Sequence, residues 1–357
     1  MDLHGGNIYR LYREGKKDIL DYSSNINPLG VPELFKNIVT ANFNVLEKYP
    51  DPEYIDLRKS IANYNNLDIN NIFVGNGATE VLFKYMQSLN PKKALIIAPS
   101  FAEYTRALES IDCEIVYYKL LPEKNFSLNV EEFTKNIPQC DLVILCNPNN
   151  PTGTFLPLET IKRLNNILKV KKIKFFIDEA FIEFIKDWQE MTAANLKDPN
   201  IFIMRALTKF FAVPGLRLGY GIYFDEELKP NLDKKTEPWS VNSFADIAGQ
   251  VMLKDEKYIT ETEAWIEKEK KWFYEQCNAI HKIKAYKTNT NFILLKLLAN
   301  TSEEVREKML EYGILIRDAS NFVGLDNQYI RLAIKDRENN TKVIEALNEV
   351  VRWKDLW

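Results

Sequence analysis

The sequence predicts an α/β fold, in which a mostly parallel sheet and its covering helices form three layers, joined to a smaller α+β domain. Three observations carry this prediction. Continuous apolar runs alternate with helical patterns up to about residue 223. Several of these runs are followed by reactive polar residues, as expected at the ligand-binding edge of such a sheet. After about residue 243 the composition shifts to a long stretch rich in Glu and Lys.

Residues 1–30 are expected to form an irregular arm, because they are polar and contain Gly and Pro. The segment His4-Gly5-Gly6 could bring an imidazole and bare backbone N–H groups to an anion, and a frayed terminus is the alternative. A helix is expected over 54–64. The turn at 75–79 leads into another helix, whose unpaired N–H groups could bind an anion unless a polar residue merely caps it.

Six apolar runs are expected to be strands of the sheet, at 94–97, 114–118, 141–145, 174–177, 201–204 and 218–223. Tyr104, Asn150, Asp178 and Lys209 each follow the end of one of these strands. Because ligands bind at the carboxyl ends of the strands in such sheets, these four side chains are expected to meet at one edge.

The last third of the chain predicts one long helix over about 243–280, whose charges form a solvated face. Strands are expected at 291–296 and 329–334, with helices at 302–311 and 339–352. We therefore expect three units: an arm at 1–35 that joins the small domain and the functional site, a large domain at 36–240, and a linking helix with the small domain at 241–357.

Composition narrows the functional classes. The net charge of −3 gives no strong field for nucleic acid or a membrane surface. The four cysteines lack CxxC spacing and there are only two histidines, so neither a metal site nor a histidine triad is expected. No apolar run has the length of a membrane span, and the first ten residues lack an apolar signal core. We expect a cytoplasmic protein with reduced thiols.

The stretch 204–220 carries the most specific chemistry. Lys209 lies among apolar residues, and burial disfavours the charged ammonium, which lowers its pKa. A lysine that can lose its proton is a nucleophile for aldehydes. Arg217 follows a Pro-Gly turn and could hold a phosphate beside the aldehyde. The alternative is a buried strand, a turn and a surface Lys/Arg pair.

The combination of Asn150-Pro151-Thr152-Gly153, Asp178, Lys209 and Arg217 resembles the fold-type I pyridoxal-phosphate enzymes of the aminotransferase class I/II family. Landmarks of that family extend from residue 4 to residue 331. The resemblance implies pyridoxal 5′-phosphate as cofactor, bound in the large domain. It implies that Lys209 forms the Schiff base and carries a proton, that Asp178 pairs with the pyridine nitrogen, and that Asn150 donates to the phenolate oxygen.

The resemblance also assigns the remaining contacts. Tyr104 would stack on the cofactor ring. Tyr49 would reach the phosphate of a cofactor in a neighbouring subunit, which implies a homodimer with shared sites. Arg331 would grip the α-carboxylate of the substrate. The cofactor phosphate would be held by Gly77, Ala78, Thr79, Thr208 and Arg217.

Two positions depart from the family pattern. Ala206 stands where Ser or Thr usually supplies a phosphate ligand, which implies a lower cofactor affinity unless Thr208 and water compensate. Phe181 stands where many members have Tyr bonded to the phenolate oxygen. That departure leaves Asn150 as the main donor and is expected to raise the pKa of the Schiff base.

Within the family, the arm and several loops are most similar to L-threonine-O-3-phosphate decarboxylases. Arg317, in Ile314–Asp318, is shared with histidinol-phosphate aminotransferases, and both groups act on phosphorylated amino compounds. Arg317 would bind the substrate phosphate with help from His4 and the backbone of Gly5 and Gly6. Asn25 and Asn27 would shape the pocket floor, or simply cap a turn. The segments that carry the similarity are His4–Asn7, Ser24–Gly30, Phe101–Tyr104, Asp178–Ile182, Thr208–Tyr220 and Pro238–Asn242.

The residues leave the reaction open. If the bond from Cα to the carboxylate is perpendicular to the cofactor ring, L-threonine O-3-phosphate loses carbon dioxide and gives (R)-1-aminopropan-2-yl phosphate. If the Cα–H bond is perpendicular, histidinol phosphate transfers its amino group to 2-oxoglutarate. We favour decarboxylation. A non-enzymatic pyridoxal-phosphate-binding module is a third possibility, although no helix-turn-helix extension or basic patch indicates DNA binding.

Overall fold

A seven-stranded sheet forms the centre of the larger domain, in the order β2-β8-β7-β6-β5-β3-β4. The neighbours from β7 to β4 are parallel, and β8 is antiparallel to both β2 and β7. The computed structural model describes residues 4–352. The strands are β2 (Ile72–Gly75), β3 (Lys93–Ala98), β4 (Glu114–Lys119), β5 (Leu142–Cys146), β6 (Lys174–Asp178), β7 (Ile201–Ala206) and β8 (Gly219–Tyr223).

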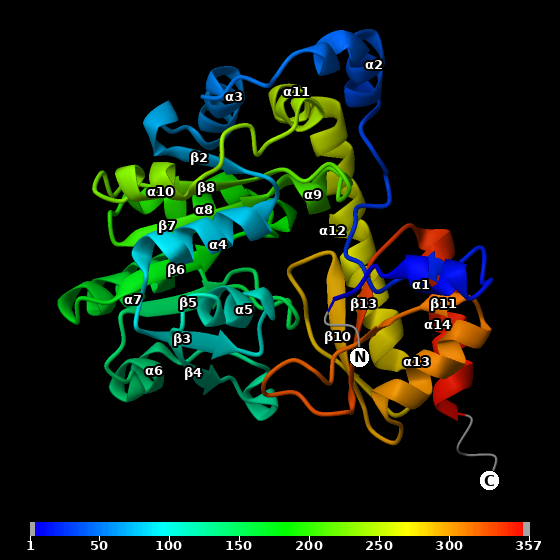
Figure 1. Cartoon of the computed structure of the whole chain (residues 1–357). Helices are drawn as coiled ribbons and strands as arrows, with labels where there is room; N and C mark the ends of the chain where they lie inside the picture. Colours follow the sequence, from blue (N-terminus) through cyan, green and yellow to red (C-terminus); the bar gives the residue numbers. More distant parts are fainter. Residues whose placement is uncertain (1–3, 353–357) are drawn as a thin grey trace.

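Helices cover both faces of this sheet, as Figure 1 shows. Alternate residues of β5 point to opposite faces: Ile144 packs with α4 and α5, and Val143 packs with α7. The helices of this domain are α2 (Glu33–Ala41), α3 (Ile55–Asn65), α4 (Ala78–Leu89), α5 (Glu103–Glu109), α6 (Val130–Asn136), α7 (Leu158–Val170), α8 (Trp188–Met191), α9 (Leu207–Phe210) and α10 (Lys229–Lys235). Short 3₁₀ turns lie at Phe43–Glu47, Ile69–Asn71, Pro122–Lys124, Ile182–Phe184 and Ala193–Leu196.

The smaller domain is built on an antiparallel sheet in the order β12-β13-β10-β9. Strand β1 of the arm pairs in parallel with β11, so the arm is fastened to this domain. Figure 1 shows the long helix α12 running along the junction between the two domains. The remaining elements are α1 (Ile8–Arg13), β1 (Leu20–Asp21), α12 (Glu256–Ala279), β9 (Ile283–Ala285), β10 (Phe292–Leu297), α13 (Ser302–Glu311), β11 (Ile314–Leu315), β12 (Arg317–Asp318), β13 (Tyr329–Ala333) and α14 (Arg337–Arg352), together with α11 (Ser243–Met252), which packs on α2 and α3 of the larger domain.

The predicted fold class is confirmed, with three corrections of detail. The arm is not wholly irregular, because Ile8–Arg13 form α1. The expected single helix over 243–280 is two helices, because the side chain of Asp255 accepts from the N–H of Tyr258 and starts α12. Strand β2 was not predicted, since its apolar run is only three residues long before Gly75. The predicted domain boundaries at 35 and 240 stay predictions.

Candidate active site

A cavity of about 430 Å³ lies at the carboxyl ends of the parallel strands, where the arm and the small domain meet the sheet. A larger cavity, of about 560 Å³, shares only Cys146 with it and contains no predicted site residue. The predicted contact residues that line the smaller cavity are His4, Gly5, Asn25, Ala78, Thr79, Asn150, Asp178, Thr208, Lys209, Arg217, Arg317 and Arg331. Three of the four side chains expected to meet at the sheet edge, Asn150, Asp178 and Lys209, therefore lie in this cavity, together with residues from the first and last parts of the sequence.

Lys209 enters the cavity from α9, the single helical turn that follows β7. Burial, together with the charges of Arg331 and Arg217, lowers its pKa to about 8. No hydrogen bond or ion pair with another residue in 4–352 engages its amine. The lowered pKa brings the neutral amine, which is the form that attacks aldehydes, closer to physiological pH than in an exposed lysine.

Asp178 ends β6 and lies in the cavity wall. Its Oδ1 accepts from the N–H of Ala180 at 2.9 Å, and its Oδ2 accepts from the hydroxyl of Tyr104 at 2.5 Å. Burial raises the pKa of Asp178 to about 6, although both hydrogen bonds oppose this rise. A cationic group in the cavity would therefore be well placed to keep this carboxylate ionised.

One end of the cavity is shaped for an anion. The N-terminus of α4 carries Ala78 and Thr79, and the first N–H groups of a helix have no acceptor within it. A Cβ on Gly77 would lie 2.5 Å from the guanidinium of Arg217, so glycine allows this arginine to reach the helix end. Gly219 similarly allows β8 to approach Ala78. Thr208 adds a hydroxyl in the cavity wall.

Two buried arginines also line the cavity. Arg317 and Arg331 are paired across β12 and β13. Arg331 donates to Oδ1 of Asn150 at 2.5 Å and to the carbonyl of Ser23 at 2.8 Å, while its buried Nε has no partner among the described residues. Burial and the nearby charge of Arg317 lower the pKa of Arg331. Two adjacent buried guanidiniums strongly favour an anionic ligand.

The arm covers the cavity next to Arg317. His4 Nε2 lies 2.6 Å from Oε1 of the buried Glu103, and Arg106 binds the same carboxylate. His4 and Gly5 line the cavity, and a Cβ on Gly5 would collide with the carbonyl of Ser23. The contact between His4 and Glu103 therefore holds the arm next to the cavity, and the sequence did not single out Glu103 for this role.

Tyr104 does not occupy the position predicted for it. It is fully buried and does not line the cavity, because its hydroxyl points to Asp178. Its ring therefore offers no face to a ligand. Phe101, three residues earlier, lines the cavity instead and lies with its ring 5.4 Å from that of His4. The Phe-Ala-Glu-Tyr motif contained both residues, and only the position of α5 distinguishes their roles.

Asn27 and Gly6 also act behind the cavity wall. Asn27 donates to the carbonyl of Phe210 and to Oγ1 of Thr262, both at 2.8 Å, and its N–H binds the carbonyl of Lys209. It therefore ties the arm to α9 and α12 instead of facing a substrate. The N–H of Gly6 donates to Ser23 Oγ, so it is already engaged. Asn25 does line the cavity, and its buried Oδ1 has no partner among the described residues.

Tyr49 lies outside the cavity, on the surface. Its side chain is 80% exposed and its ring packs against that of Trp239 at 4.8 Å. Exposed Phe43 and Leu46 lie in the 3₁₀ turn just before it. This position is compatible with contact to a second subunit, and the predicted role of Tyr49 stays a prediction.

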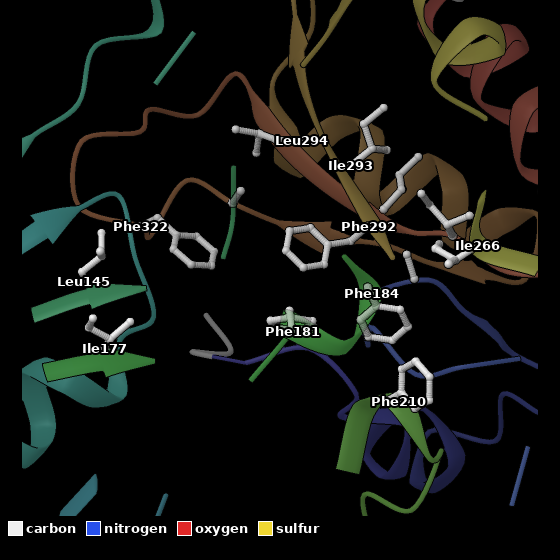
Figure 2. Packing of buried hydrophobic residues seen from close by; sticks show 14 of the residues in the cluster. Leu145, Ile177, Phe181, Phe184, Phe210, Ile266, Phe292, Ile293, Leu294 and Phe322 are labelled. Atoms are coloured by element: carbon white, nitrogen blue, oxygen red, sulfur yellow. The ribbon is translucent and has the colours of Figure 1, made fainter. Parts of the chain in front are cut away.

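The two departures from the family pattern, Ala206 and Phe181, both lie in the cavity wall. In Figure 2, the ring of Phe181 lies beside those of Phe292 and Phe184, at centroid distances of 5.0 and 6.3 Å. The wall at this point is therefore apolar, without the hydroxyl that tyrosine would supply. Cys146 and Phe322, which the sequence analysis did not single out, also line the cavity.

Residues 4–352 contain neither a membrane-spanning helix nor a metal-ligand cluster. No helix in this range combines the length and apolar content needed to span a membrane. Within the same residues, no three side chains of the His, Cys, Asp and Glu types cluster as metal ligands would.

Comparison with known proteins identifies the family. Residues 17–347 match the model of aminotransferase class I and II. A protein of Caldanaerobacter subterraneus subsp. tengcongensis, provisionally named threonine-phosphate decarboxylase, is 44% identical over 347 residues, covering 96% of this chain and 92% of its own. The threonine-phosphate decarboxylase of Salmonella typhimurium is 34% identical over 351 residues, covering 98% and 96%.

A solved structure gives the same assignment of fold. The histidinol-phosphate aminotransferase from Clostridium acetobutylicum superimposes with a TM-score of 0.88 and is 40% identical, covering 94% of this chain and 99% of its own. The family model spans nearly the whole chain, and two named relatives exceed 30% identity over almost all of it. This chain therefore belongs to the aminotransferase class I and II family of pyridoxal-phosphate-dependent enzymes.

Proposed function

We propose that this chain binds pyridoxal 5′-phosphate and decarboxylates L-threonine O-3-phosphate to (R)-1-aminopropan-2-yl phosphate. The observation that carries the proposal is the pair of adjacent buried arginines, Arg317 and Arg331, in the same cavity as Lys209 and Asp178. An amino acid phosphate has two anionic groups, a phosphate and a carboxylate, and the two guanidiniums supply one partner for each. The similarity to named threonine-phosphate decarboxylases supports the same substrate.

The cavity residues fit the cofactor as a set. The N-terminus of α4, Thr208 and Arg217 would hold its phosphate, and Asp178 would pair with its ring nitrogen. Asn150 has its Oδ1 occupied by Arg331, which leaves its amide N–H groups to face the phenolate oxygen. Phe101, which lies just before α5, is an aromatic residue in the cavity wall. It replaces Tyr104 as the candidate for contact with the cofactor ring.

The bound cofactor would supply an electron sink for a bond at the substrate Cα. Arg331 and Arg317 would fix the carboxylate and the phosphate and thereby select which Cα bond is perpendicular to the ring. In decarboxylation the carboxylate would leave as carbon dioxide, and Lys209, whose pKa is about 8, would deliver one proton to Cα in its place. The arm, pinned by the contact between His4 and Glu103, would exclude water from the phosphate end.

Histidinol-phosphate aminotransferase is the second candidate, and the 40% identical structure of that name favours it. The two activities separate in one experiment on the full-length protein loaded with pyridoxal phosphate. L-threonine O-3-phosphate should release carbon dioxide with no need for an oxo acid. Histidinol phosphate with 2-oxoglutarate should give no glutamate. Glutamate formation without carbon dioxide release would refute the first assignment and establish the second, and the variant Lys209→Ala serves as the blank for both.

We further propose that the protein is a homodimer in which Tyr49 contacts the cofactor phosphate of the partner subunit. The exposed aromatic surface around Tyr49 and Trp239 supports this proposal, because contiguous exposed apolar side chains usually mark a contact surface.

A further inference from the structure

Asp178 belongs to a small buried group that comes from three elements. Tyr104 is on α5, Cys146 ends β5 and is paired in register with Asp178, and Asp178 ends β6. All three side chains are buried. The hydroxyl of Tyr104 lies 2.5 Å from Oδ2 of Asp178, while the N–H of Ala180 holds Oδ1 at 2.9 Å. Two donors from different elements therefore fix the plane of the carboxylate.

No cation among residues 4–352 forms an ion pair with Asp178, although Lys209, Arg217 and Arg331 line the same cavity. Tyr104 faces it from α5, Cys146 from β5, and Glu179 follows it in the chain, while β7 places Met204 beside it. Burial raises the pKa values of Tyr104 and Cys146 as well, so both keep their protons around neutral pH. Tyr104 can therefore act only as a donor to the carboxylate. Within residues 4–352, Asp178 forms no ion pair that would stabilise its ionised carboxylate.

We propose that Tyr104 is the positioning residue that keeps Asp178 ionised and aimed at the cavity, instead of the ring-stacking residue that the sequence suggested. The reason is geometric: its hydroxyl is the only side-chain donor among the described residues that reaches Asp178. A charged carboxylate gains more from such a bond than a neutral carboxyl does, so the bond opposes the effect of burial. This inference holds for either proposed reaction, since both need an ionised partner for the ring nitrogen.

The test uses Tyr104→Phe, which removes the hydroxyl and keeps the ring. Infrared difference spectra of the full-length protein, recorded before cofactor is added, would follow the carboxylic acid band of Asp178 with pH, and Asp178→Asn would assign that band. The titration midpoint should rise by about one to two pH units, as expected for the loss of a hydrogen bond to a charged group. After loading, the affinity for pyridoxal phosphate should fall about tenfold between pH 8 and pH 6 relative to wild type.

Tyr85→Phe is the matched control, because Tyr85 is buried in the same layer and packs against Phe202 without touching Asp178. It should leave the Asp178 midpoint unchanged. A midpoint in Tyr104→Phe within a few tenths of wild type would overturn the proposal.

Should Tyr104→Phe fail to fold, 3-fluorotyrosine at position 104 keeps the ring and the hydroxyl and makes the hydroxyl a stronger donor. It should move the midpoint downward, and an unchanged midpoint there would equally contradict the proposal. Because neither readout requires turnover, failure of the decarboxylase assignment would not affect them.

Discussion

Lys209 shows how reactivity and stability oppose each other at a single residue. The same burial and neighbouring guanidiniums that bring its pKa down to about 8 also make its charged form unfavourable in the folded protein. The folded pKa lies below the unfolded value, so the unfolded state binds more protons between about pH 8 and pH 10.5. The free energy of unfolding therefore rises with pH between about pH 8 and pH 10.5. Below pH 8 the folded protein bears the full cost of burying the charged ammonium of Lys209.

Lys209→Met is accordingly expected to stabilise the cofactor-free protein at pH 7 by up to about 3 kcal/mol, since each pKa unit corresponds to about 1.4 kcal/mol. The advantage should shrink as the pH approaches 10.5. Thermal unfolding at pH 7 and pH 10 would measure both effects. Lys257→Met, at an exposed position, is the control and should change stability little. A destabilised Lys209→Met at pH 7 would contradict the electrostatic account.

Phe181 leaves the cavity wall apolar where a tyrosine would add a hydroxyl. Introducing that hydroxyl by Phe181→Tyr should favour the ionised phenolate of the bound cofactor, and the pH-dependent absorption change of the loaded protein should then move to lower pH. The measurement is a visible absorption titration. Phe184→Tyr, at a buried position that does not line the cavity, should leave the titration in place. An unchanged midpoint in Phe181→Tyr would show that the residue does not influence the ring.

At the scale of elements, the N-terminus of α4 combines a constrained glycine turn with the nearby positive charge of Arg217. Gly77 has φ +83°, a conformation that favours glycine, and it leaves room for Arg217 beside the helix end. Arg217 itself has φ +62°, after the turn that follows α9. The proposed anion-binding end of the cavity therefore depends on two loops whose backbone conformations are both constrained.

Gly77→Ala should weaken the binding of pyridoxal phosphate by at least about tenfold, because the added Cβ would displace Arg217 and strain the turn. Fluorescence or absorption titration with the cofactor would measure the loss. Gly15→Ala separates the two causes, since Gly15 has φ +80° with no atom within 4 Å of an added Cβ. That control should lower stability without changing cofactor affinity, whereas equal affinities for wild type and Gly77→Ala would argue against a phosphate site here.

At the scale of the whole molecule, the proposed dimer makes each site depend on both chains. Lys209 lies in the cavity of its own chain and Tyr49 lies on the surface. Lys209→Ala and Tyr49→Ala should each reduce activity strongly as homodimers. When the two variants are unfolded, mixed and refolded together, each mixed dimer regains one intact site, so activity should recover to about a quarter of wild type.

Activity after mixing is compared with the same variants refolded separately. Sedimentation measurements on the wild type should show a dimer. A monomer, or a mixture no more active than its parts, would exclude the shared site.

Much of this protein follows from its sequence alone. The apolar runs determine the parallel strands, and the short polar segments after them determine which side chains can meet at the sheet edge. Lys209, Asp178, Asn150, Arg217 and Arg331 were all placed in one cavity as expected. The order of strands β2 and β8 and the break between α11 and α12 were not predicted, because short strands and helix breaks depend on tertiary contacts and single caps.

Only the tertiary structure decided which way side chains on the same motif point. Phe101 faces the cavity and Tyr104 faces Asp178, although both belong to one four-residue segment of the sequence. Asn25 lines the cavity while Asn27 holds the backbone of Lys209. The physical reason is that spacing along the chain sets which residues are near, whereas orientation is set by buried partners from distant elements, which no local pattern contains.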